Sequence, residues 1–128
     1  MNNDRFRIWD KALKTYNENY FYIHPTGKLF RLSIAGELLR VDSTRFEREN
    51  CTGLLDKNGR LIYAGDVVSF SWQLKDNEVC KIVWDKIHCS FACVDIKTGA
   101  DFITWYSVFE NGQSDRCEII GNIHKPGA

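Results

Sequence analysis

Cysteine and histidine are the residues of this chain whose type and spacing could bind a metal or act as a nucleophile. Three residues separate Cys89 from Cys93, and His88 directly precedes Cys89. On a strand over residues 89–96, the two cysteines share a face but lie too far apart for a tight zinc chelate. His88 and Cys89 would point to opposite faces, which does not suit a Cys/His nucleophile pair. We therefore expect no metal site, no cofactor and no cysteine catalysis.

The chain has five cysteines in all, an odd number, and contains no Cys-x-x-Cys spacing. We expect reduced thiols, as is typical of a cytoplasmic protein. Cys80, Cys93 and Cys117 stand among apolar strand residues, so we expect them to behave as small apolar core residues.

Two aspartates lie in turn signals at the centre of the chain, Asp56-Lys57-Asn58-Gly59 and Ala64-Gly65-Asp66. A catalytic or calcium-binding role would need further carboxylates at alternating positions and a closing Glu, which this sequence lacks. The simpler interpretation is that each Asp side chain binds nearby backbone N–H groups. Asn58-Gly59 between apolar runs predicts a hairpin with a type I′ turn, in which both residues have positive φ.

The sequence contains none of the common signatures of nucleotide-binding or serine enzymes. It has no G-x-x-x-x-G-K-S/T or G-x-G-x-x-G loop, and no Ser in a G-x-S-x-G elbow. We therefore predict that the protein is not an enzyme and has no catalytic residues.

Aromatic residues interleaved with basic ones are the most suggestive sign of a binding surface. On a small β-barrel such residues can stack on nucleic-acid bases, although the alternative is ordinary core packing. Trp9 lies opposite Phe6 and Ile8 on its predicted strand, so we expect it to be exposed, in an interface or packed between lobes. The other candidate surface residues are Trp72, Lys81, Trp84, Trp105 and Tyr106.

Short strands separated by turn residues must position these side chains. We predict a polar turn or short helix over 10–19, a loop with one helical turn over 42–50, where Thr44 and Glu47 form a capping box, and a turn at 75–77. The predicted strands are residues 5–9, 20–23, 28–34, 37–41, 61–63, 66–72, 78–84, 89–96, 102–109 and 117–123.

This pattern predicts a mostly β fold with several antiparallel hairpins and little helix. We expect an N-terminal β-meander lobe over residues 1–50. Residues 51–128 would form a small, SH3-like, partly open barrel built on the central hairpin, and the two parts together would make one compact unit.

Composition fits a globular chain. Of 128 residues, 44% are hydrophobic and 27% charged, and the formal net charge is +0. Without a basic run, net charge does not support tight nucleic-acid binding, although a local patch made by the fold stays open. No apolar segment approaches the roughly 20 residues of a membrane span, and the polar start shows no secretory signal. We expect a soluble, cytoplasmic protein with no membrane partner.

Several motifs are spread almost from end to end of the chain. They are Phe6-Arg7-Ile8-Trp9-Asp10-Lys11, Thr52-Gly53-Leu54, Asp56-Lys57-Asn58-Gly59, Ile62-Tyr63-Ala64-Gly65-Asp66-Val67-Val68, Val83-Trp84-Asp85 and Glu118-Ile119-Ile120-Gly121-Asn122-Ile123-His124. In order and spacing these motifs resemble the YopX family of small proteins encoded by bacteriophages and prophages, so the expected cytoplasm is that of the bacterial host. Ala64 departs from the pattern, because the family usually carries an acidic residue there.

The resemblance implies a phage or prophage origin and a mostly β fold, and it implies no catalytic activity. We predict a non-enzymatic accessory protein that binds an unknown macromolecular partner and forms a homo-oligomer, because short sheets leave edges that need cover. The alternative is nucleic-acid or nucleotide binding through an aromatic face of the barrel. The motif residues to which we assign structural turns are Thr52, Gly53, Asp56, Asn58, Gly59, Tyr63, Gly65, Asp66, Gly121 and Asn122.

Overall fold

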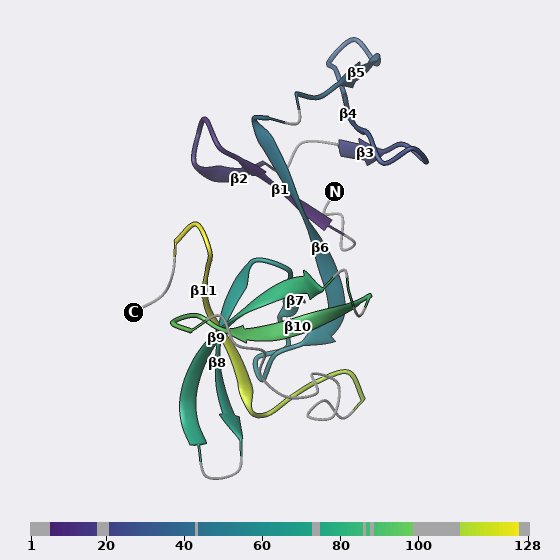
Figure 1. Cartoon of the computed structure of the whole chain (residues 1–128). Helices are drawn as coiled ribbons and strands as arrows, with labels where there is room; N and C mark the ends of the chain where they lie inside the picture. Colours follow the sequence, from purple (N-terminus) through teal and green to yellow (C-terminus); the bar gives the residue numbers. More distant parts are fainter. Residues whose placement is uncertain are drawn as a thin grey trace. The chain divides into compact units, whose positions relative to one another are not determined.

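The computed structural model describes residues 6–17, 21–42, 44–72, 75–85, 87, 89–98 and 111–125 (Figure 1). These residues form antiparallel sheets and contain no helix, which confirms a mostly β fold. The chain divides into two compact units, unit 1 (Met1–Glu49) and unit 2 (Asn50–Ala128). The boundary between the units falls inside strand β6 (Phe46–Leu55).

Unit 1 contains two groups of strands around a small core. β2 pairs with β1, which pairs with β6, and a separate meander has the order β3-β4-β5. The strands are β1 (Phe6–Asp10), β2 (Thr15–Asn17), β3 (Phe21–Ile23), β4 (Leu29–Leu32), β5 (Leu38–Arg40) and the first part of β6. The core of unit 1 consists of Phe6, Ile8, Phe21 and Val41, with Leu29 and Phe46 packed against it.

Unit 2 is built on a four-stranded sheet of order β10-β9-β8-β11, beside the hairpin of β6 and β7. Its strands are β7 (Leu61–Tyr63), β8 (Asp66–Trp72), β9 (Lys75–Asp85), β10 (Ser90–Asp95) and β11 (Cys117–Asn122). The larger of the two cores lies here, and both Val67 and Val68 of β8 are fully buried. Its members are Leu54, Ile62, Val68, Phe70, Cys80, Ile82, Cys93, Cys117 and Ile119, with Phe91 packed against them.

The central hairpin forms as predicted, but with a different turn. β6 pairs with β7 through Leu55 and Leu61. Gly59 has a φ of +77°, whereas Asn58 is not among the described non-glycine residues with positive φ. The Asp56 N–H donates to Arg60 O (2.9 Å) and the Gly59 N–H donates to Asp56 O (3.0 Å). The type I′ prediction is therefore wrong, and the loop is a tight turn followed by a glycine in the left-handed region.

Two other local predictions are wrong, and a third is right only in part. The expected loop over 42–50 is largely strand, because β6 begins at Phe46 and hydrogen-bonds to β1. Thr44 caps no helix there, since its N–H and Oγ both donate to Asp42 Oδ1 (2.9 and 2.7 Å). The segment 10–19, predicted as a turn or short helix, has a turn at residues 11–14 and then strand β2, and residues 75–77 belong to β9 instead of a turn. β6 pairs with the distant β1, whereas β2 pairs with the adjacent β1 and the start of β9 with the adjacent β8. In each case strand pairing overrides a polar local sequence.

The predicted strand over 102–109 lies outside the described residues. The SH3-like topology of unit 2 stays a prediction. Among the described residues, no helix is long and apolar enough to span a membrane.

Candidate functional site

Asp56 is fully buried in unit 2, and both oxygens of its carboxylate accept hydrogen bonds from backbone N–H groups. Oδ1 accepts the N–H groups of Asn58 (3.0 Å) and Arg60 (2.9 Å), which closes the hairpin loop. Oδ2 accepts the N–H of Ile119 (3.1 Å) from β11, 63 residues away along the chain. This side chain therefore ties the hairpin loop to β11, and its hydrogen-bonding capacity is used for structure.

Asp66 has a related environment at the second turn. It is buried, and its Oδ2 accepts the N–H of Tyr63 (2.8 Å). Gly65 has a φ of +92°, its N–H donates to Ile82 O (2.8 Å), and its carbonyl accepts the N–H of Ile123 (2.7 Å). The turn therefore hydrogen-bonds to β9 and to the end of β11 through the backbone of one glycine.

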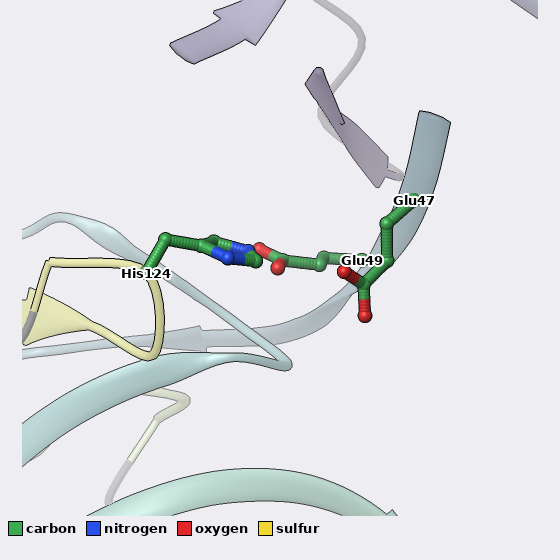
Figure 2. A group of neighbouring side chains, drawn as sticks. All are labelled: Glu47, Glu49 and His124. Atoms are coloured by element: carbon green, nitrogen blue, oxygen red, sulfur yellow. The ribbon is translucent and has the colours of Figure 1, made fainter. Parts of the chain in front are cut away.

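The remaining motif residues lie near these turns. The Thr52 Oγ donates to Ile62 O (2.8 Å) and accepts the N–H of Leu54 (3.1 Å). Gly53 has a φ of +80°, and the β11–β8 register shifts between Ile119 and Gly121. Asn122 Oδ1 accepts the N–H of His124 (2.9 Å), which follows β11 (Figure 2).

The cysteines of unit 2 lie mostly inside the core, as predicted. Cys80, Cys93 and Cys117 are buried, and the Sγ atoms of Cys80 and Cys93 are 2.7 Å apart. The contact with Cys80 and burial raise the pKa of Cys93, and burial raises the pKa of Cys117 to about 12. The thiols of Cys93 and Cys117 therefore stay protonated at neutral pH, which is unfavourable for a nucleophile or a metal ligand.

Cys89 lies in a turn and not on a strand, because β10 begins at Ser90 and Cys89 has a φ of +50°. It is exposed, whereas Cys93 is buried. The expectation that the two share one strand face is therefore wrong. His88 lies outside the described residues.

Of the predicted aromatic surface, the structure describes the side chains of Trp9, Lys81 and Trp84. Trp9 is only 6% exposed, so an exposed ring at this position is ruled out. Trp84 is 48% exposed and meets Phe91 edge-on, with ring centroids 5.0 Å apart. Lys81, three residues from Trp84 on β9, faces the opposite side of that strand. Trp72 lies in β8, and Trp105 and Tyr106 lie outside the described residues.

In unit 1, two buried acids are neutralised by arginines. Arg45 makes a two-pronged contact with Asp10, Nε to Oδ1 (3.0 Å) and Nη2 to Oδ2 (2.9 Å). This hydrogen bonding, with the N–H groups of Leu13 and Ala12, lowers the pKa of Asp10 to about 2. Arg45 and Asp10 are therefore a structural pair across the end of β1.

The second buried acid is Glu49, which lies two residues after Glu47 on β6 (Figure 2). Its Oε1 accepts hydrogen bonds from Arg7 Nε (2.7 Å) and from the hydroxyl of Tyr16 (2.8 Å). The guanidinium of Arg7 lies over the Tyr16 ring, 4.4 Å from its centroid. This contact explains how so polar a segment as the start of β6 becomes a strand.

A groove within unit 1 is a feature that sequence reasoning missed. Its volume is about 730 Å³. It is lined by Gly27, Lys28, Leu29, Arg40, Val41, Asp42, Phe46 and Arg48. Its three basic residues, Lys28, Arg40 and Arg48, are widely spaced in the sequence and come from different strands or their ends. The sequence therefore shows no run of basic residues that would predict this site, and only the strand pairing places the three around one groove.

Comparison with known proteins decides the family. The sequence model described as YopX protein matches residues 5–127. The chain belongs to the YopX family. The match covers nearly the whole chain and confirms the resemblance drawn from the central turn motifs.

A solved structure supports the fold of this YopX chain. It is similar to the crystal structure of protein EF1440 from Enterococcus faecalis, with a TM-score of 0.58 and 17% sequence identity. The similarity covers 97% of this chain and 95% of that one, and at this identity it concerns the fold alone. A search of curated proteins found no match.

Proposed function

We propose that this YopX chain is a non-enzymatic phage or prophage accessory protein of the bacterial cytoplasm. In this proposal it acts by binding and associates with a second copy of itself through the β3-β4-β5 sheet of unit 1. One observation carries the proposal: this small sheet exposes an unusual amount of apolar surface.

Most strands of a soluble protein hide their large apolar side chains, but β5 hides none of its three residues. Leu38 is 60% exposed, and Leu39 is also exposed. Contiguous apolar surface of this kind marks interaction sites. The exposed large apolar residues of this sheet and its connecting turn are Tyr22, Ile23, Leu32, Ile34, Leu38 and Leu39.

The backbone of β5 is also suited to pairing. In the part of the chain that the structure describes, β5 has a neighbouring strand on one side only. The Val41 N–H donates to Leu29 O (3.0 Å) and the Ser33 N–H donates to Glu37 O (2.8 Å). Because hydrogen-bonded pairs alternate along an antiparallel ladder, the N–H and C=O groups of Leu38 and Arg40 point to the open edge.

A second copy of β5 fits this edge in a symmetric register. With Leu39 opposite Leu39 on the two-fold axis, Leu38 of each copy exchanges backbone hydrogen bonds with Arg40 of the other. No two arginines then face each other, and the sheet face that carries Tyr22, Leu32 and Leu38 in each copy continues across the pair. Like charges directly opposite would be unfavourable, so this register favours a second copy as the occupant.

The environment of the acidic residues supports a non-enzymatic role. The carboxylates of Asp10, Asp56 and Asp66 accept backbone N–H groups of their own turns or strands. Glu49 is held by Arg7 and Tyr16. These acids serve the fold, and the pKa of Asp10 is lowered to about 2, the opposite of the raised pKa that marks a general acid at neutral pH.

Light scattering coupled to size-exclusion chromatography tests the proposal, with the whole chain at tens of micromolar. We expect a dimer for the wild type and a monomer for Leu38→Glu, because a charge would then sit on the apolar contact. Leu13→Glu is the matched control, since Leu13 is 67% exposed in the same unit but outside this sheet. A monomeric wild type, or equal effects of both substitutions, would contradict the proposal.

A second candidate function is single-stranded nucleic-acid binding by unit 2. The exposed Trp84 ring beside Phe91 supports it, since a base can stack on such a pair. Quenching of tryptophan fluorescence by a single-stranded oligonucleotide at low salt, lost in Trp84→Ala, is the expected result. An unchanged spectrum would remove this candidate.

A further inference from the structure

The groove of unit 1 combines positive charge with an apolar floor. We propose that it binds a short acidic peptide segment of a partner protein, in which carboxylate and apolar side chains alternate. Its volume of about 730 Å³ falls in the range of built ligand sites, roughly 300–1,000 Å³. The inference does not require self-association, because it rests on side chains of the groove; Arg40 alone belongs to both, through its backbone at the edge of β5 and its side chain in the groove.

The floor of the groove is continuous with the core of unit 1. Leu29 of β4 and Val41, which directly follows β5, are adjacent, since the Val41 N–H donates to Leu29 O (3.0 Å). Phe46 packs against the same core. An apolar side chain entering here would extend a packed surface that already exists, at little cost in reorganisation.

The basic residues around the groove differ from other arginines of the same unit. Arg7 and Arg45 are held by Glu49 and Asp10. By contrast, among the residues that the structure describes, no acidic side chain forms an ion pair with Lys28, Arg40 or Arg48. Their long side chains are exposed and remain available to an anionic ligand.

Asp42 is the acidic residue lining the groove, and it does not neutralise these cations. Its Oδ1 accepts hydrogen bonds from the Oγ (2.7 Å) and the N–H (2.9 Å) of Thr44. These hydrogen bonds hold the pKa of Asp42 below its usual value. Three cations against one carboxylate leave an excess of positive charge. Charge complementarity therefore selects a ligand with more than one carboxylate.

An acidic peptide fits better than a nucleic acid. The aromatic ring of the floor, Phe46, already contacts Phe21 (centroids 5.6 Å apart) and the Arg45 guanidinium (5.0 Å from its centroid). It is therefore a poor stacking platform for a base. The chain as a whole is formally neutral, so no long-range field draws a polyanion to it.

Fluorescence anisotropy tests the inference with three labelled probes and the full chain. The probes are a short peptide of alternating Glu and Leu, the same peptide with Gln for Glu, and an oligothymidylate of equal length. We expect the Glu/Leu peptide to bind at low salt and to weaken as salt rises, while the other two bind far less.

The double variant Lys28→Gln/Arg48→Gln should bind the acidic peptide about tenfold more weakly. Both positions lie outside β5, so the oligomeric state, measured on the same samples, should not change. Arg31→Gln is the matched control, an exposed cation of β4 that does not line the groove. The inference fails if the Glu/Leu peptide does not bind, if the Gln/Leu peptide or the oligothymidylate binds as well, or if Arg31→Gln weakens binding equally.

Discussion

The two units of this YopX chain use the same kinds of residues in different ways. In unit 2, Asp56 and Thr52 hydrogen-bond to backbone groups, and three of the cysteines lie in the core. In unit 1, a small core coexists with exposed leucines and with cations that have no acidic partner among the described residues. In our proposal, unit 2 provides stability and unit 1 provides the surfaces for recognition.

The largest expected effect tests whether the buried polar side chains of unit 2 stabilise the fold. Asp56→Ala removes the acceptor for three backbone N–H groups, one of them from the neighbouring strand β11. An unpaired buried donor costs roughly 1–3 kcal/mol, so we expect a loss of about 3 kcal/mol in the free energy of unfolding. Urea titration of the full chain measures it.

Asp115→Ala provides the control for that experiment, because Asp115 is exposed in a nearby turn of the same unit. We expect this substitution to leave the unfolding midpoint almost unchanged. If Asp56→Ala were equally harmless, the carboxylate of Asp56 would be free for another role and the comparison would fail.

A smaller effect, expected only at acidic pH, concerns the ion pair of Asp10 and Arg45 in unit 1. The pKa of Asp10 is lowered from 3.8 to about 2, chiefly by Arg45. Because the folded state lowers this pKa, the stabilisation is complete above about pH 4 and is lost as pH falls from there toward 2. Asp10→Asn should therefore flatten the acid side of the stability curve, measured by thermal unfolding between pH 5 and 2.

Arg45→Gln should flatten the same part of the curve, because it removes the main cause of the lowered pKa. A normal acid slope in both variants would show that this pair contributes nothing to stability. The contrast between the paired Arg45 and the unpaired basic residues of the groove, which supports peptide binding there, would then be lost.

The smallest effect separates backbone strain from packing at the central turn. Gly59 has a φ of +77° with open space where a Cβ would stand, so Gly59→Ala introduces strain without a clash. We expect a loss of roughly 1 kcal/mol in the free energy of unfolding. Gly59→Asn should lose less, since asparagine tolerates this region better. Equal losses for both would indicate that something other than φ limits this position.

Much of unit 2 could be predicted from sequence, because its signals are local. Asp56 and Gly59 mark a loop, and the alternation of Val68 and Phe70 marks a buried strand. Unit 1 is harder, since its decisive contacts join distant residues. The start of β6 looks like a polar loop until Arg7 and Tyr16 meet Glu49.

The candidate sites show the same limit. An aromatic platform of Lys81 and Trp84 fails because the two lie three residues apart on one strand. The groove could not be found from the sequence, because Lys28, Arg40 and Arg48 are brought to it by strand registers that no short motif encodes.

Hydrogen exchange at the edge of β5 tests the central claim most directly. The account predicts that the amides of Leu38 and Arg40 are protected at high protein concentration and exchange rapidly on dilution or in Leu38→Glu. The Val41 amide, bonded to Leu29 within the sheet, should stay protected throughout. Rapid exchange of Leu38 and Arg40 at every concentration, beside a protected Val41, would contradict pairing through this edge.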